Sequence, residues 1–377
     1  MSGFGASARV DLDAVAHSVA ACAAAAPTAA VMAVVKADGY GHGLLPAARA
    51  ALAGGASWLG TAHVGEALAL REAGVTAPLL TWLNPPGAPL ADAVAQGIDV
   101  AVSAPWALAQ ATAAGRVARI HLKIDTGLRR NGAGPDEVDD LLAAAAEAQA
   151  AGAIELIGIM THFVHADSPD HPTTEAQLER FRAILARAAT YGLHPQVRHC
   201  ANSAATLTRP DTHFDLVRPG IACYGLTPLP QLGGPERFGL TPAMSLRAAV
   251  ALTKTAQPGD GVSYGHIWTA EEPTPLALIP LGYADGVPRA ASNVGQVLLA
   301  GTRRTIAGRV CMDQFVVPAD SATEAGDEVV VFGSGQEGEP TAQEWADWLD
   351  TLSYEIVTRV GARVPREYVG EPAAGHG

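Results

Sequence analysis

Segments with the pattern of β-strands alternate with segments of helical pattern through the first two-thirds of this chain. The predicted strands are residues 31–36, 58–61, 79–83, 100–102, 117–124, 154–160, 197–199 and 216–217. The predicted helices are residues 44–53, 65–73, 88–96, 105–114, 135–151, 174–191 and 203–207. About eight such units close a parallel barrel. The sequence therefore predicts an α/β fold that begins with a (β/α)8 barrel.

The pattern changes near Phe238. The β-rich runs beyond it are residues 248–253, 276–279, 294–299 and 328–332, and turn signals separate them. A helical pattern returns at residues 341–348. The length of 377 residues suits two domains. We predict a barrel over residues 1–237 and a mainly β domain over residues 238–377.

Composition argues against several classes of partner. The net charge is -13 and no run of lysine or arginine appears, which disfavours a nucleic acid. The apolar segment 14–35 is mostly alanine, contains His17 and Pro27, and follows no basic region. It therefore fits neither a signal peptide nor a membrane span. The four cysteines form no C-x-x-C pair, which fits a protein of the reducing cytoplasm.

Polar side chains collect where the predicted barrel strands end. They are Lys36, Lys123, Asp125, Thr161, His162, His199, Asn202, Ser203 and Arg218. Barrels of this kind carry their active sites at the C-terminal ends of the strands. We therefore expect these side chains to surround one site.

Lys36 ends an apolar run and precedes a loop with three glycines, in Val34-Val35-Lys36-Ala37-Asp38-Gly39-Tyr40-Gly41-His42-Gly43. A desolvated lysine loses its proton more easily and can form an imine with an aldehyde cofactor. Alternatively, the strand simply ends in a tight turn and Lys36 reaches water. The motif by itself does not separate these readings.

A phosphate site is expected near the last strands of such a barrel. Ser203 opens a predicted helix, and Gly220-Ile221 offers backbone N–H groups, so together they can hold an anion. Taken singly, Ser203 is an ordinary N-cap and Gly220 an ordinary turn residue. Taken with Lys36, they point to a phosphate-bearing aldehyde, and we predict pyridoxal 5'-phosphate.

Nine motifs in order along the chain resemble those of the alanine racemases, barrel-type (fold-type III) pyridoxal-phosphate enzymes. The motifs are AVVKADGYGHG, KIDTGLRRNG, THF, RHCANSAATL, LVRPGIACYGL, GVSYGH, LGYADG, GRVCMDQ and SYEIVTRVGARVPREY. They cover nearly the whole length, and the ordered set is highly specific. The resemblance implies a homodimeric isomerase that interconverts L-alanine and D-alanine and supplies D-alanine for the cell wall.

The resemblance also implies a role for each matched residue. Lys36 matches the lysine that binds the cofactor and acts as base on one face of the substrate. Tyr264 matches the base on the other face, supplied by the second subunit. The other cofactor-binding positions are Tyr40, His162, His199, Ser203, Arg218, Gly220, Ile221, Tyr354 and Arg130. The substrate positions are Arg130, Met312 and Tyr283. Lys123 matches a lysine that can be carbamylated.

Arg218 matches the residue that faces the pyridine nitrogen of the cofactor. An arginine has a pKa above ~12 and does not readily hand over a proton. We therefore expect the ring nitrogen to stay unprotonated, which disfavours side reactions such as transamination. Arg129 departs from the family, which more often has a small residue there. An extra cation at this point would alter the pKa values of its neighbours or the carbamylation of Lys123.

We expect no metal, although His162, His165, Asp167 and His171 lie close in sequence, because the resemblance already explains His162. Other enzyme readings are a serine or broad-range racemase and a decarboxylase of the same barrel class. A non-catalytic pyridoxal-phosphate carrier would resemble the barrel alone. A racemase-like sensory domain would have a DNA-binding or membrane segment attached.

Overall fold

The computed structural model describes residues 5–370, which form two compact units. The barrel unit contains residues 15–39 and 44–240, and the β-rich unit contains residues 5–14, 40–43 and 241–370. The boundary that we predict after residue 237 stays a prediction.

The barrel unit is built on a parallel sheet in the order β8-β7-β6-β5-β4-β3-β2-β9. Its strands are β2 (Ala30–Val34), β3 (Trp58–Thr61), β4 (Leu79–Thr81), β5 (Asp99–Val102), β6 (Ala118–Lys123), β7 (Ile154–Met160), β8 (Val197–His199) and β9 (Leu216–Val217). The Asp215 N–H donates to the Arg198 carbonyl at 3.2 Å, and the Arg218 N–H donates to the Ala201 carbonyl at 2.9 Å. These bonds join the β8 and β9 ends, so the sheet closes and the predicted (β/α)8 fold is confirmed.

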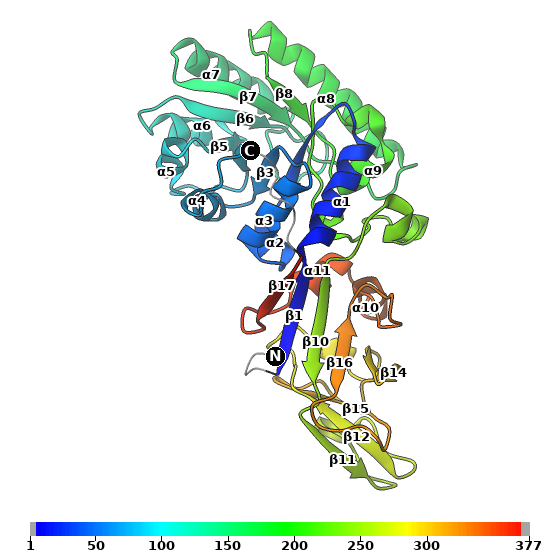
Figure 1. Cartoon of the computed structure of the whole chain (residues 1–377). Helices are drawn as coiled ribbons and strands as arrows, with labels where there is room; N and C mark the ends of the chain where they lie inside the picture. Colours follow the sequence, from blue (N-terminus) through cyan, green and yellow to red (C-terminus); the bar gives the residue numbers. More distant parts are fainter. Residues whose placement is uncertain (1–4, 371–377) are drawn as a thin grey trace. The chain divides into compact units, whose positions relative to one another are not determined.

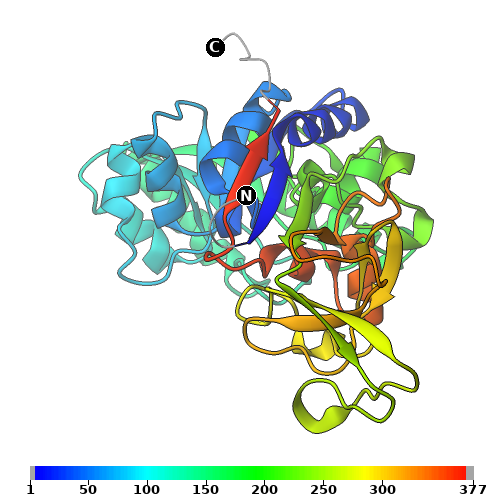
Figure 2. The same ribbon diagram turned by 60° about the horizontal axis from the view of Figure 1, so that its bottom comes forward.

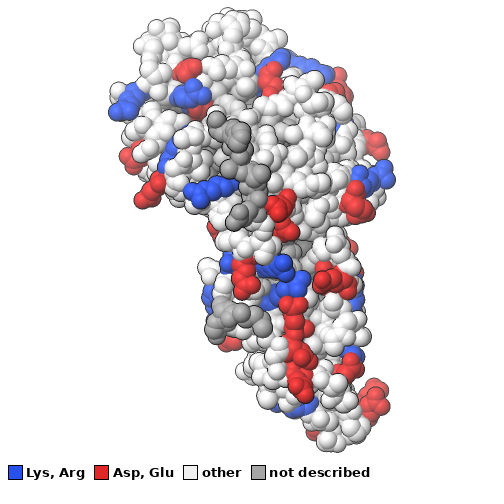
Figure 3. All heavy atoms as spheres, in the orientation of Figure 1, with Lys and Arg blue, Asp and Glu red and all other residues white. Residues whose placement is uncertain are grey.

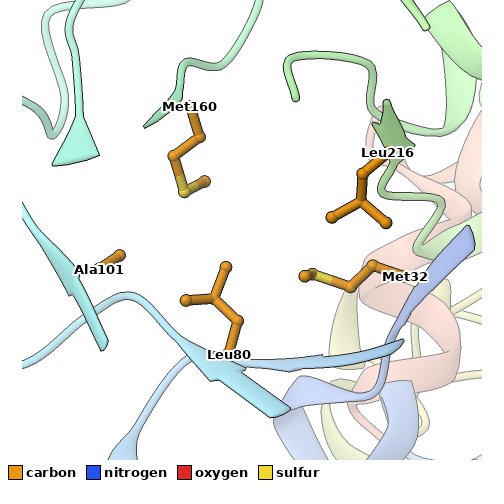
Figure 4. Packing of buried hydrophobic residues seen from close by; sticks show 5 residues of the cluster. All are labelled: Met32, Leu80, Ala101, Met160 and Leu216. Carbon is orange, nitrogen blue, oxygen red and sulfur yellow. The ribbon is translucent and has the colours of Figure 1, made fainter. Parts of the chain in front are cut away.

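Helices cover the outside of this sheet (Figure 1). They are α1 (Leu12–Ala25), α3 (Leu44–Ala53), α4 (Val64–Glu72), α5 (Leu90–Ala95), α6 (Pro105–Thr112), α7 (Val138–Ala150), α8 (Pro172–Thr190) and α9 (Ser203–Thr208). Inside the sheet, apolar side chains from β2, β4, β5, β7 and β9 point toward one another (Figure 4): Met32, Leu80, Ala101, Met160 and Leu216. The barrel centre is therefore a packed core, as expected for this fold.

The β-rich unit contains a six-stranded sheet in the order β14-β13-β16-β10-β1-β17. These strands are β1 (Ala6–Asp11), β10 (Met244–Ala249), β13 (Gln296–Leu299), β14 (Thr302–Thr305), β16 (Glu328–Phe332) and β17 (Arg366–Val369). β1 is antiparallel to β10 and parallel to β17, so this strand pairs with two strands from the second half of the chain (Figure 2).

A second sheet of this unit has the order β11-β12-β15, with β11 (Leu252–Ala256), β12 (Thr274–Ile279) and β15 (Phe315–Pro318). Two short helices follow, α10 (Ala342–Trp348) and α11 (Ser353–Thr358). The predicted single strand over residues 248–253 was wrong, because β10 and β11 belong to different sheets. The Val250 N–H bonds to Asp327 while the Ala251 N–H bonds to Leu278, so the chain changes sheets between these two residues.

Charged side chains stand singly or in small mixed groups on the face shown in Figure 3. Within residues 5–370, no helix is both long enough and apolar enough to span a bilayer.

Candidate active site

Lys36 stands at the carboxyl ends of the barrel strands because three hydrogen bonds fix the chain just before it. The Val34 N–H donates to the Pro219 carbonyl at 3.0 Å, and the Val35 N–H donates to the Gly60 carbonyl at 2.8 Å. The Tyr224 hydroxyl donates to the Val34 carbonyl at 3.0 Å. The predicted strand therefore ends earlier than expected, at Val34, and Lys36 begins the next element.

That element is α2 (Lys36–Tyr40), in which Ala37, Asp38 and Gly39 have left-handed φ angles of 54°, 55° and 60°. Left-handed backbone costs an L-residue about 1–2 kcal/mol. Two carboxylates hold it in place: Glu66 accepts from the Ala37 N–H at 2.6 Å, and Asp38 accepts from the Leu44 N–H at 2.8 Å. Backbone strain of this kind concentrates at functional sites.

The electrostatic surroundings of Lys36 favour a neutral amine. Burial lowers its pKa, the nearby Arg130 lowers it further, and Glu66 acts in the opposite direction. A lysine amine must be neutral to act as a nucleophile or a base. Arg130 itself is exposed.

Lys123 ends β6 and is 8% exposed. Burial lowers its pKa to about 7, with further contributions from Arg218, Arg130 and Lys36. Apart from burial, the causes of this shift are neighbouring cations. Four of the predicted site residues therefore influence one another electrostatically at the same barrel edge.

Arg218 follows β9 and is 5% exposed. Its guanidinium donates to the Thr161 carbonyl at 2.7 Å and to His199 Nδ1 at 3.1 Å. Burial lowers the pKa of Arg218 to about 10, so the guanidinium stays charged near neutral pH. Burial and the Arg218 charge hold the pKa values of His162 and His199 well below the usual range, which makes both rings neutral.

Ser203, Gly220 and Ile221 lie together as predicted. Ser203 is the first residue of α9, and Ile221 begins the turn η2 (Ile221–Tyr224). The Ser203 hydroxyl oxygen accepts from the Gly220 N–H at 2.8 Å and from the Ala222 N–H at 3.4 Å. The start of α9 and two backbone donors of the η2 turn therefore meet at this hydroxyl, an arrangement that suits an anion.

The remaining predicted residues belong to the β-rich unit. Tyr40 is buried, and its ring lies 6.3 Å from that of Tyr354 on α11, measured between ring centroids. The chain next to Tyr40 is held in place by Arg366, whose Nε donates to the Gly41 carbonyl at 3.0 Å. A Cβ atom on Gly41 would lie 2.5 Å from the Val357 carbonyl oxygen. The two predicted phosphate tyrosines thus lie next to each other.

Tyr264 begins the turn η5 (Tyr264–His266) and is 73% exposed. Non-glycine residues with left-handed φ flank it, Ser263 at 62° and His266 at 46°. The Ser263 hydroxyl donates to the Arg309 carbonyl at 2.7 Å and so holds the turn. Tyr264 also lines a hollow of about 720 Å³ with Lys254.

Tyr283 and Met312 lie in neighbouring loops, and both side chains are about half exposed. The Tyr283 N–H donates to the Cys311 carbonyl at 3.0 Å, and the Ala284 N–H donates to the Met312 carbonyl at 2.9 Å. Gly282 permits this approach, because a Cβ atom there would lie 2.2 Å from the Met312 oxygen. The structure therefore brings these two predicted substrate residues together.

Residues that sequence reasoning left without a role also belong to the barrel site. Glu66 holds the loop after Lys36. His121 lies within 2.8 Å of His199, and Asp99 within 3.1 Å of His121. His121 lies inside the predicted strand 117–124 and Asp99 directly precedes the predicted strand 100–102. The signal was this position, because a charged or titratable side chain in a buried strand needs a partner.

Arg129 and His165 both lie in loops of the barrel unit. Arg129 is exposed and lines a hollow of about 410 Å³ with Arg180 and Arg187. His165 stacks on His171, with ring centroids 3.8 Å apart. In the described part of the chain, no group of three or more histidine, cysteine and acidic side chains has the geometry to hold a metal.

A closed parallel barrel with two lysines and a buried arginine at its strand ends, continued by a mainly antiparallel β-rich unit, defines a class of two-part barrel enzymes. The chain matches the model of the alanine racemase N-terminal domain over residues 10–228 and that of the C-terminal domain over residues 243–368. The chain belongs to the alanine racemase family.

Individual relatives agree over nearly the full length. An alanine racemase of Thermobifida fusca is 58% identical over 375 residues, which cover 98% of this chain and 99% of that protein. The crystal structure of alanine racemase from Streptomyces lavendulae is 54% identical, with a TM-score of 0.96 and 97% of each chain covered. The alanine racemase of Bacillus anthracis with bound L-Ala-P is 33% identical, with a TM-score of 0.89, 99% of this chain and 97% of that chain.

These comparisons confirm the resemblance, the fold and the prediction of an enzyme of the racemase class. They also separate the chain from the predicted alternative of a carrier that resembles the barrel alone, because the second family model matches beyond the barrel.

Proposed function

We propose that this protein interconverts L-alanine and D-alanine with pyridoxal 5'-phosphate, using Lys36 and Tyr264 as bases on opposite faces of the substrate. The observation that carries the proposal is the place of Lys36, at the carboxyl end of a barrel strand with a pKa lowered by burial and by Arg130. The 58% identity to an alanine racemase supports the choice of substrate.

The donor groups present fit this cofactor. Ser203 and the backbone N–H groups at Gly220 and Ile221 suit its phosphate. Lys36 suits its aldehyde, and the charged Arg218 suits a ring nitrogen that accepts a hydrogen bond. When bound, the cofactor supplies an electron sink that acidifies the α-hydrogen of an amino acid. We assign supporting roles at the cofactor to Tyr40, Tyr354, His162, His199 and Arg130.

Inversion at the α-carbon needs a proton removed from one face and a proton delivered to the other. We propose that the Lys36 amine serves one face and the Tyr264 hydroxyl serves the other. Because Tyr264 is 73% exposed in the single chain, we propose that it acts in the site of a second copy. Arg130, Met312 and Tyr283 are proposed to orient the substrate.

We further propose that the enzyme works in the cytoplasm, where D-alanine is needed as a precursor of peptidoglycan.

The test is to incubate the purified protein and added cofactor with L-alanine in deuterated water. D-Alanine should form with deuterium at the α-carbon. We expect Tyr264→Phe to abolish net racemisation while exchange of one enantiomer continues through Lys36. Absence of both D-alanine and exchange would refute the proposal, and a faster reaction with L-serine would refute the substrate assignment.

A further inference from the structure

We propose that Asp99 and His121 are positioning residues that act on Arg218 through His199. They set which ring nitrogen of His199 carries hydrogen, and so hold the Arg218 guanidinium in place as a donor toward the cofactor ring. The inference rests on the proposed function only in the last step, from Arg218 to the cofactor. We call the four side chains Arg218, His199, His121 and Asp99 the barrel relay.

The barrel relay is continuous. Arg218 Nη1 lies 3.1 Å from His199 Nδ1, and His199 Nε2 lies 2.8 Å from His121 Nδ1. His121 Nε2 lies 3.1 Å from Asp99 Oδ2. His199 and His121 are 0% exposed, Asp99 is 1% exposed and Arg218 is 5% exposed. Water therefore cannot replace any of these partners without the barrel opening.

The direction of every hydrogen bond follows from the two ends. A guanidinium has donors and no acceptor, so His199 Nδ1 must accept. A neutral histidine then carries its hydrogen on Nε2, which donates to His121 Nδ1. His121 in turn carries hydrogen on Nε2 and donates to the Asp99 carboxylate. Both histidines are thereby fixed as the Nε2–H tautomer, which follows from hydrogen-bond chemistry and the observed distances.

The charges around the relay support neutral rings. Burial is the main cause that lowers the pKa of His121 and of His199, and the Arg218 charge lowers both. Asp99 raises the pKa of His121 without outweighing burial. Asp99 is itself held by Arg119, whose Nε lies 2.6 Å from Asp99 Oδ1. The carboxylate is therefore fixed as an acceptor at the far end.

The backbone makes room for this arrangement. The register of β6 and β7 shifts between Ile120 and His121, so that His121 pairs with Gly158. A Cβ atom on Gly158 would lie 2.3 Å from His121 Nδ1, the atom that accepts from His199. Asp99 is the first residue of β5, and Arg218 follows the end of β9. The barrel relay therefore runs from the amino end of a barrel strand to the carboxyl end of another, where the candidate site lies.

The decisive variant is Asp99→Asn, which keeps the shape and removes the fixed acceptor. With its oxygen held by Arg119, the new amide would present N–H groups to His121. His121 would then accept on Nε2 and donate from Nδ1, His199 would do the same, and His199 Nδ1–H would face the donor Arg218. We expect kcat to fall roughly 10- to 100-fold, as when the carboxylate behind a functional histidine is lost, with little change in KM.

The readout that does not depend on activity is ¹⁵N NMR of histidine-labelled protein loaded with cofactor. We expect Nε2–H tautomers for His121 and His199 in the wild type and Nδ1–H tautomers in Asp99→Asn. The matched control is Asp215→Asn, which breaks another Asp–Arg pair of the barrel unit, with Arg198 Nε 2.7 Å from Asp215 Oδ2. The control should change neither the tautomers nor kcat.

A second pair of variants keeps the test valid if Asp99→Asn does not fold. In His121→Gln the amide oxygen can replace Nδ1 as acceptor and the amide nitrogen can replace Nε2 as donor. The leucine of His121→Leu offers neither group. We expect the glutamine variant to retain the His199 tautomer and most of kcat, and the leucine variant to lose both. Wild-type tautomers and kcat in Asp99→Asn, or equal losses in both His121 variants, would overturn the inference. If no variant or wild type racemises alanine, the proposed function fails while the tautomers still decide the relay.

Discussion

At the residue scale, burial lowers the pKa values of the lysines at the candidate site. The chain has three lysines, Lys36, Lys123 and Lys254, and two of them stand at the barrel edge with lowered pKa values. Each is disfavoured in its charged form by burial first and by neighbouring cations second. A lowered pKa increases the fraction of each amine that is neutral and able to form a covalent bond.

Lys123 should therefore react with carbon dioxide. Its neutral amine attacks the carbon, loses a proton and becomes a carbamate, an anion suited to pair with Arg130. With a pKa of about 7, the neutral fraction falls as the pH drops below 7, so carbamylation should fall with it. The measurement is ¹³C NMR after adding ¹³C-bicarbonate at pH 8 and then lowering the pH.

Because the chain has only three lysines, single substitutions can assign the carbamate resonance. Lys123→Met should remove the carbamate resonance, whereas Lys254→Met, a change of an exposed lysine, should retain it. A resonance that survives in Lys123→Met, or that grows as the pH falls, would contradict the assignment.

At the scale of elements, two short helices, α9 and η2, begin next to each other at the carboxyl ends of the barrel strands. α9 and η2 meet at the Ser203 hydroxyl, which accepts two backbone N–H groups. Short helices are marginal alone and depend on such tertiary contacts. Their arrangement therefore links stability of the fold to binding of an anion.

Ser203→Ala tests this link. The Gly220 and Ala222 N–H groups lose their acceptor, which should cost about 1–3 kcal/mol of unfolding free energy. Affinity for pyridoxal 5'-phosphate should fall as well. Urea unfolding and an absorbance titration measure the two effects. Thr208→Ala, which removes a hydroxyl from the same helix, is the control, since the Thr208 hydroxyl donates to the Ala204 carbonyl at 2.8 Å within that helix. Unchanged cofactor affinity in Ser203→Ala would refute this phosphate assignment.

At the scale of the whole molecule, the proposed site needs a second copy of the chain to supply Tyr264. Closed two-fold dimers are the commonest soluble assembly, and each copy then offers the same surface to the other. Lys36 and Tyr264 of one chain would in that case serve different sites.

Mixing two inactive variants decides this question. Lys36→Ala and Tyr264→Phe should each lose activity alone. When they are refolded together, half the dimers are mixed and each has one intact site, so activity should return to roughly a quarter of the wild type. Refolding Lys36→Ala with the double variant should give no recovery. If the first mixture also stays inactive, Tyr264 acts within its own chain.

The local pattern of apolar and polar residues was enough to predict most strands and helices of the barrel. It missed elements that depend on pairing with segments far away along the chain. The predicted strand over residues 154–160 and the helix over residues 44–53 agree with β7 and α3 to the residue. β1 escaped notice because it is held by β10 and β17, which lie more than 230 residues away along the chain. The left-handed turn at Ala37 and Asp38 was also missed, since glycine signals a turn without fixing its hand.

The sequence by itself determined the order of most barrel strands and helices, the family, and the side chains that stand at the strand ends, because periodicity and motifs are local properties. Only the tertiary structure decided how β9 closes the sheet, where the chain leaves β10 for β11, and how Arg218 meets Asp99 through two histidines. Hydrogen bonds between distant segments set these features. Desolvation by the folded barrel sets the pKa of Lys123, and no linear pattern contains that quantity.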